Sequence, residues 1–218
     1  MLYILLFSPD ASSLQILSDT FTAPDMLFSA YESLFQVFVF YIPALAVVLY
    51  FSFQDTPDLP LKQSPRLNSL FISKLNFFLY VLFGTAILLL IGAFIVFIEN
   101  LLPDPGWFGA NFTLIEAPKG LFTILIMILY CVCAAYLEES FFRVFFYRRM
   151  LLSGIKKLCA VVVSAILFAA CHLWEGFWGM ADAFLSGIVL SFLFERKKSL
   201  NCIALSHALY NIAVYLLP

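Results

Sequence analysis

Six apolar stretches dominate the sequence, and each is long enough, or nearly long enough, to cross a lipid bilayer as a helix. A membrane-spanning helix needs about 20 apolar residues, and its backbone groups must bond to one another because lipid offers them no partners. The segments between the stretches contain the Pro, Gly and Asp residues typical of loops. We therefore predict an all-α fold, a polytopic membrane helical bundle of about six transmembrane helices. The stretches run approximately over Phe28–Phe53, Phe77–Ile98, Leu121–Phe146, Leu158–Trp174, Met180–Phe194 and Leu200–Leu217.

The composition excludes most water-soluble classes of protein. Of the 218 residues only 12% are charged and 63% are hydrophobic, whereas a soluble domain has about a quarter of its residues charged. The net charge of −2 offers no basic surface for nucleic-acid phosphates. A soluble enzyme, a nucleic-acid-binding domain and a disordered chain are therefore excluded. We expect residues 1–218 to form a single integral-membrane domain in contact with the lipid bilayer, without nucleic acid.

The cysteines and the first residues fit the same interpretation. The five cysteines are odd in number, lie in or beside apolar stretches and form no Cys-x-x-Cys pair, so we expect buried thiols rather than disulfides or a metal site. The start of the chain, MLYILLF, lacks the basic residues of a secretory signal peptide. Insertion is therefore expected to depend on the internal stretches.

The basic residues predict the orientation in the membrane. Most Lys and Arg residues lie in alternate loops, while the intervening loops contain only Lys119 and many acidic residues. Because positive loops remain on the cytoplasmic side, this alternation predicts that both termini lie outside the cytoplasm. The residues in the positive loops are Lys62, Arg66, Lys74, Arg148, Arg149, Lys156, Lys157, Arg196, Lys197 and Lys198.

The third apolar stretch contains three charged residues that topology does not explain. Glu138, Glu139 and Arg143 lie within six positions of one another, although a charge at the bilayer centre costs about 2.5–3.5 kcal/mol on insertion scales. Glu139 and Arg143 are four apart, which favours a same-face ion pair and leaves Glu138 without a cation. Alternatively, the three side chains lie near the inner end of the helix and extend to the membrane surface.

The two histidines of the chain, His172 and His207, both fall in apolar stretches, and Asn211 lies one helical turn after His207. A single membrane histidine often only joins two helices. Together with an unpaired glutamate, however, the pair favours a shared site. Glu138 and His172 can activate a water for attack on a carbonyl, while His207 and Asn211 stabilise the oxyanion.

Two other chemistries fit these residues less well. Glutamate and histidine also bind zinc, but the sequence has no His-Glu-x-x-His motif and only one clear carboxylate accompanies the histidines. Ser140 and Ser206 are the nearest hydroxyls, and neither has a base at helical spacing. Metal-dependent hydrolysis is therefore possible but weakly indicated, and serine catalysis ranks low.

The sequence contains three motifs in order: Glu138-Glu139-x-x-x-Arg143, Phe168-x-x-x-His172 and His207-x-x-x-Asn211. They resemble the motifs of the CPBP intramembrane glutamic endopeptidases, also called the ABI family. That family includes type II CAAX prenyl endopeptidases and bacterial relatives linked to peptide maturation and bacteriocin immunity. The resemblance covers about residues 120–215, a catalytic core with an intramembrane catalytic cavity. Members often have eight spans, so six would be a small version of the fold.

The resemblance implies a role for each motif residue. Glu138 would activate water with His172, His207 and Asn211 would form the oxyanion hole, and Glu139, Arg143 and Phe168 would support them, with no metal or cofactor. A membrane-associated peptide or protein would be the substrate, in a bacterial inner membrane. Family members also carry small residues between the last two motifs, and here Ala183, Gly187 and Ser191 are expected to serve close helix packing alone.

Three functions remain open at this point. The first is an intramembrane endopeptidase acting on membrane-associated substrates, including lipidated or CAAX-like ones. The second is a non-proteolytic binding or bacteriocin-immunity protein of the same fold. The third is a proton- or ion-coupled carrier using Glu138, Glu139 and Arg143 as a relay, which the lack of inverted repeats disfavours.

Overall fold

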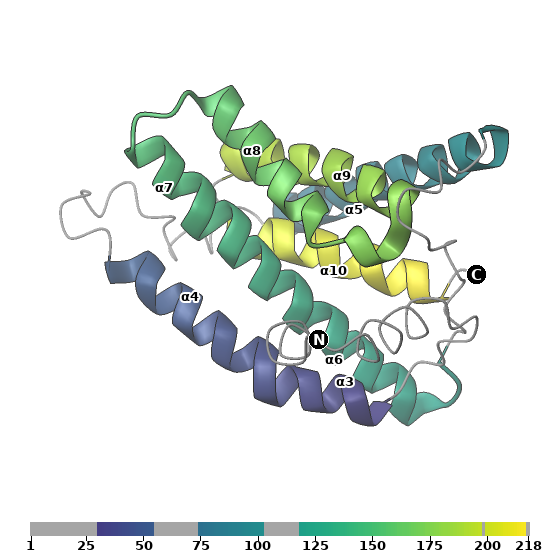
Figure 1. Cartoon of the computed structure of the whole chain (residues 1–218). Helices are drawn as coiled ribbons and strands as arrows, with labels where there is room; N and C mark the ends of the chain where they lie inside the picture. The colour runs from purple at the N-terminus through teal and green to yellow at the C-terminus, as the bar shows by residue number, and fades with distance from the viewer. Residues whose placement is uncertain (1–29, 55–73, 103–117, 198, 217–218) are drawn as a thin grey trace, which may run out of the picture.

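The computed structural model describes residues 30–54, 74–102, 118–197 and 199–216, and these ranges form a bundle of helices without strands (Figure 1). The basic loop residues Lys62, Arg66 and Lys198 lie outside the described residues. The helices are α3 (Ala30–Gln36), η1 (Val37–Tyr41), α4 (Ile42–Gln54), α5 (Lys74–Leu101), α6 (Leu121–Glu139), η3 (Ser140–Phe146), α7 (Tyr147–Leu152), α8 (Lys157–Ala170), η4 (Leu173–Glu175), α9 (Gly176–Lys197) and α10 (Leu200–Leu216).

Each predicted apolar stretch overlaps a helix, and the all-α membrane bundle is confirmed. Among the described residues, four helices are long and apolar enough to span a membrane: Ala30–Ser52, Asn76–Leu101, Leu121–Leu152 and Leu173–Arg196. The first joins α3, η1 and α4, and the third joins α6, η3 and α7. The remaining two stretches form shorter apolar helices, α8 with 14 residues and α10 with 17.

The predicted fourth span is wrong at its C-terminal end. The helix α8 ends at Ala170 rather than Trp174, and a turn with the short helix η4 leads directly into α9. His172 therefore lies in this turn rather than within a helix. The fifth apolar stretch, predicted to begin at Met180, also begins earlier, because α9 starts at Gly176.

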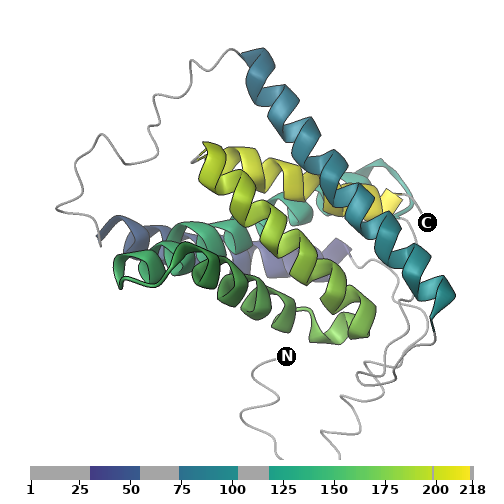
Figure 2. The same ribbon diagram turned by 90° about the horizontal axis from the view of Figure 1, so that it is seen from above.

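The helix α10 occupies the middle of the bundle, where it contacts α5, α6 and α9 (Figure 2). The helix α8 packs against α9, and the N-terminal helix of α3, η1 and α4 lies along α6 and η3. Most side chains of that N-terminal helix are exposed, for example Phe35 at 66% and Tyr50 at 60%. Such large apolar side chains require lipid rather than water around them.

Small residues allow α5 and α10 to approach closely. A Cβ atom on Gly84 would lie 2.5 Å from the Ser206 hydroxyl, and that hydroxyl donates to the carbonyl oxygens of Val81 and Cys202. In return, Thr85 donates to the Ser206 carbonyl at 3.2 Å. Close backbone approach and interhelical hydrogen bonds are the interactions that hold membrane helices together, because lipid removes the hydrophobic driving force.

The helix that carries the acidic pair changes its winding directly after Glu139. Residues Ser140–Phe146 form a π-helix, a wide turn that is rare and frequent at functional sites. The Ser164 hydroxyl on α8 donates to the Phe142 carbonyl of this segment at 3.1 Å. The π-helix, which itself contains Arg143, is thus fixed to α8 at the residue directly before the arginine.

Candidate active site

The acidic pair divides into one neutralised and one partly accessible carboxylate. Arg143 Nη1 donates to Glu139 Oε1 at 3.0 Å, and both side chains are completely buried. The side chain of Glu138, by contrast, is 30% exposed. The predicted Glu139–Arg143 pair is confirmed, and because neither residue reaches the protein surface, the alternative that these two extend to the membrane interface is wrong.

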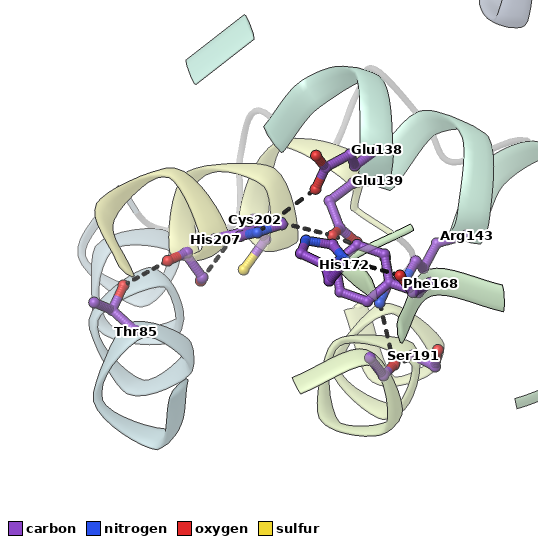
Figure 3. A network of polar contacts seen from close by, with 11 residues as sticks. Thr85, Glu138, Glu139, Arg143, Phe168, His172, Ser191, Cys202 and His207 are labelled. Atoms are coloured by element: carbon purple, nitrogen blue, oxygen red, sulfur yellow. Dashed lines mark hydrogen bonds and ion pairs between the residues drawn. The ribbon is translucent and has the colours of Figure 1, made fainter. Parts of the chain in front are cut away.

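His207 lies between the two glutamates (Figure 3). Its Nδ1 atom lies 2.9 Å from Glu139 Oε1, and its Nε2 atom lies 3.8 Å from Glu138 Oε2. The first distance is a hydrogen bond from the imidazole to the carboxylate, whereas the second is too long for one. The Nε2 atom of His207 is therefore oriented toward Glu138 without being bonded to it.

His172 reaches the same region from the turn after α8. Its Nδ1 atom lies 2.8 Å from the Phe168 carbonyl oxygen. A carbonyl only accepts, so Nδ1 must carry the proton, and in the neutral ring Nε2 retains its lone pair. The hydrogen bond thus selects the tautomer in which Nε2 can accept a proton.

Phe168 packs against both histidines and the arginine. Its ring centroid is 4.7 Å from that of His172 and 5.9 Å from that of His207, and the Arg143 Cζ atom lies 4.6 Å from it on the ring face. The side chain is only 2% exposed. One aromatic ring therefore contacts polar side chains from three separate segments.

Asn211 follows His207 by four residues on α10, so the two lie on one helical face. Its side chain is partly exposed and forms no hydrogen bond to another described residue. The amide is therefore available to a ligand.

Gly187 does more than allow close packing. A Cβ atom there would lie 3.2 Å from the Phe168 ring and 3.3 Å from the Ala165 backbone, which confirms the predicted packing of α9 on α8. Its carbonyl oxygen, however, also accepts from Arg143 Nη2 at 3.2 Å. The backbone of α9 thus also anchors the arginine, a contact that leaves the predicted packing role of the small side chains unchanged.

Sequence reasoning missed a second polar group beside the site. The Tyr210 hydroxyl donates to Asp182 Oδ2 at 2.7 Å, joining α10 to α9. Asp182 and the mostly buried Glu175 both interact electrostatically with His172 and His207. A charged residue inside the apolar stretch Met180–Phe194 was the available signal, since such residues are rarely idle.

The alternative chemistries find little support in this geometry. Among the described residues, no group of three His, Cys, Asp or Glu side chains is placed to hold a metal ion. The five cysteines are free thiols, but the expectation that all are buried is wrong, because Cys159 and Cys171 are exposed. The Ser206 hydroxyl donates to two carbonyl oxygens, and Ser140 is fully buried. Neither serine is placed as a nucleophile with a base beside it.

The fold and this cluster define an integral membrane protein with a polar site buried among its helices. Residues 120–213, which include α6 to the C-terminal part of α10, match the family model described as type II CAAX prenyl endopeptidase Rce1-like. This match includes all seven predicted site residues and agrees with the resemblance to the CPBP and CAAX endopeptidases that the three motifs indicate. No curated protein and no solved structure matches the chain.

Proposed function

We propose that this chain is an intramembrane endopeptidase that hydrolyses membrane-associated substrates, including lipidated or CAAX-like ones, with water activated by Glu138 and His172. The observation that carries the proposal is the asymmetry of the acidic pair. Arg143 neutralises the buried Glu139, whereas among the described residues the partly exposed Glu138 has only His207 within ion-pair distance, at 3.8 Å.

In the first step, a water bound between Glu138 and His172 loses a proton. The Glu138 carboxylate and the His172 Nε2 lone pair are the two available acceptors, and the Nδ1 bond to Phe168 keeps that lone pair directed away from α8. The water oxygen forms a bond to the peptide carbonyl carbon as the carbonyl becomes an oxyanion. The proton then passes to the leaving amine when the C–N bond breaks.

His207 and Asn211 stabilise the oxyanion. Because His207 donates from Nδ1 to Glu139, it can donate from Nε2 only as an imidazolium. In that state the charges of the two glutamates, Arg143 and His207 sum to zero, which suits a buried cluster. The partner-free amide of Asn211 supplies the second donor, and preorganised donors of this kind contribute strongly to catalysis.

The membrane orientation is part of the same proposal. The turn between α7 and α8 is flanked by four basic residues: Arg148, Arg149, Lys156 and Lys157. Lys157 forms an ion pair with Glu195 near the end of α9. These basic ends would face the cytoplasm of a bacterial cell, with both termini outside the inner membrane. Labelling of the exposed Cys159 with a membrane-impermeant thiol reagent tests this directly, since an inner position predicts protection in intact cells.

The central experiment compares membrane proteomes of cells that express wild-type protein or Glu138→Ala. Uncleaved precursors should accumulate with Glu138→Ala, and the purified wild-type protein should cleave them. Glu32→Gln, which changes an exposed acid on α3, is the matched control and should behave as wild type. If purified Glu138→Ala and His172→Ala proteins still cleave, the mechanism is wrong. If no precursor changes while a protective phenotype persists in Glu138→Ala, the non-proteolytic immunity function replaces it.

A further inference from the structure

Three polar atoms form a row along one face of α9. Trp178 Nε1, Asp182 Oδ1 and Ser186 Oγ are each buried and have no hydrogen-bond partner among the described residues. The three residues are spaced by four, which places them above one another on the same face of the helix. Three consecutive unpartnered groups in one line are unusual, because buried polar groups nearly always have partners.

The row is buried and its geometry is specific. Trp178 is 9% exposed and Ser186 is 5% exposed. The other oxygen of Asp182 accepts from Tyr210 at 2.7 Å, which fixes the carboxylate. By contrast, the Ser191 hydroxyl on the same helix has a partner, because it donates a hydrogen bond to the Gly187 carbonyl at 2.8 Å.

The backbone spacing of the row is close to the distance that one water molecule can bridge. Residues four apart are separated by about 6 Å along the helix axis, and a water with two hydrogen bonds of about 2.8 Å joins groups separated by about 5.6 Å. Buried waters typically satisfy polar groups that lack a protein partner, and they need two to four such partners. The Trp178 indole donates a hydrogen bond, the Asp182 carboxylate accepts one, and the Ser186 hydroxyl can do either, so the row offers water both donors and acceptors.

The row also lies beside the candidate active site. Asp182 interacts electrostatically with His172 and His207, and Tyr210, its hydrogen-bond partner, directly precedes Asn211 on α10. Glu175, three residues before Trp178, interacts with Glu138 and both histidines. Hydrolysis consumes one water for each peptide bond, and the surrounding lipid cannot supply it.

We propose that Trp178, Asp182 and Ser186 hold a file of ordered water molecules that supplies the hydrolytic site. The role in hydrolysis depends on the proposed function, whereas the binding of water by the row does not. The row is thus a site for water between α9 and α10, and Asp182 is its central positioning residue.

Radiolytic hydroxyl labelling in nanodiscs without substrate tests the water site, because side chains beside bound water are oxidised fastest. Trp178 should be oxidised in the wild-type protein despite its burial. Ser186→Val, which replaces the hydroxyl by a methyl group and adds a second methyl group, should lower that labelling severalfold, and Ser191→Val should leave it unchanged. Absence of Trp178 labelling in the wild type, or equal labelling in Ser186→Val, overturns the water site.

Kinetics on an identified substrate test the role of the site. Ser186→Ala should lower kcat about tenfold with little change in KM or melting temperature, because the lost hydroxyl binds no protein group. An unchanged kcat together with reduced Trp178 labelling refutes the role in hydrolysis. If Trp178 is labelled but wild-type protein cleaves nothing, the proposed function fails while the water site stands. A raised KM at constant kcat would instead assign the row to substrate binding and overturn the proposal.

Discussion

Replacement of Arg143 by methionine should strongly destabilise the protein. Methionine fills a similar space but removes the guanidinium, and with it the bond to Glu139 at 3.0 Å and the bond to the Gly187 carbonyl at 3.2 Å. The Glu139 carboxylate, which is completely buried, then retains only the bond from His207. Removal of one partner from a buried ion pair costs about 3–5 kcal/mol, because the remaining charge stays desolvated.

The double variant Glu139→Gln/Arg143→Met isolates the electrostatic part of this loss. Glutamine removes the charge and keeps an oxygen that accepts from His207, so the buried site is no longer left with an unpaired carboxylate. We therefore expect the double variant to recover about 1–3 kcal/mol relative to the sum of the single variants. Lys157→Met is the matched control, since Lys157 is 56% exposed in its pair with Glu195, and exposed pairs contribute about 0–1 kcal/mol.

The measurement is the free energy of unfolding in mixed micelles, followed by circular dichroism as the denaturing detergent increases. Arg143→Met should lose at least twice as much free energy as Lys157→Met. Equal losses for these two variants would show that the Glu139–Arg143 pair is well solvated. In that case the distinction between Glu139, which Arg143 neutralises, and Glu138, which faces only His207, would lose its physical basis.

Three further predictions concern catalysis and packing. Asn211→Ala should lower kcat about 100- to 1,000-fold at nearly constant melting temperature, because the amide has no partner among the described residues; a large loss of stability would indicate a structural role instead. Gly187→Ala should destabilise the protein by about 1–3 kcal/mol, since its Cβ would lie 3.3 Å from the Ala165 backbone. The free energy of unfolding in micelles tests this, and an unchanged value would mean that α8 and α9 can separate to accommodate the methyl group. Cleavage should persist in excess chelator, whereas a zinc-dependent enzyme would lose activity, and restoration by added metal would contradict the water mechanism proposed above.

Local features of this protein follow from the sequence, and long-range ones do not. The Glu139–Arg143 pair is predictable because residues four apart on a helix meet regardless of the rest of the fold. The positions of the helices are predictable as well, because hydropathy depends only on residues that are consecutive in the sequence. The bond between His207 and Glu139, by contrast, joins residues separated by 68 positions, and no spacing rule reports the relative depth of two helices.

The end of α8 shows a second limit. Ala170, Cys171 and Leu173 are as apolar as the helix before them, so hydropathy alone continues the span to Trp174. The structure ends the helix at Ala170, and backbone hydrogen bonds from Cys171 and His172 close its last turn. The π-helix after Glu139 had no signal either, because its aromatic residues suit an ordinary helix equally well.

The short α8 has a consequence for the lipid around it. Its 14 residues extend about 21 Å, which is less than the hydrocarbon thickness of about 30 Å. Trp174, 48% exposed just beyond its end, is a residue type that prefers the headgroup region. The leaflet beside this turn is therefore expected to thin to meet the protein. Local hydrophobic mismatch would bring the headgroups, and any substrate residue anchored at them, to the depth of His172.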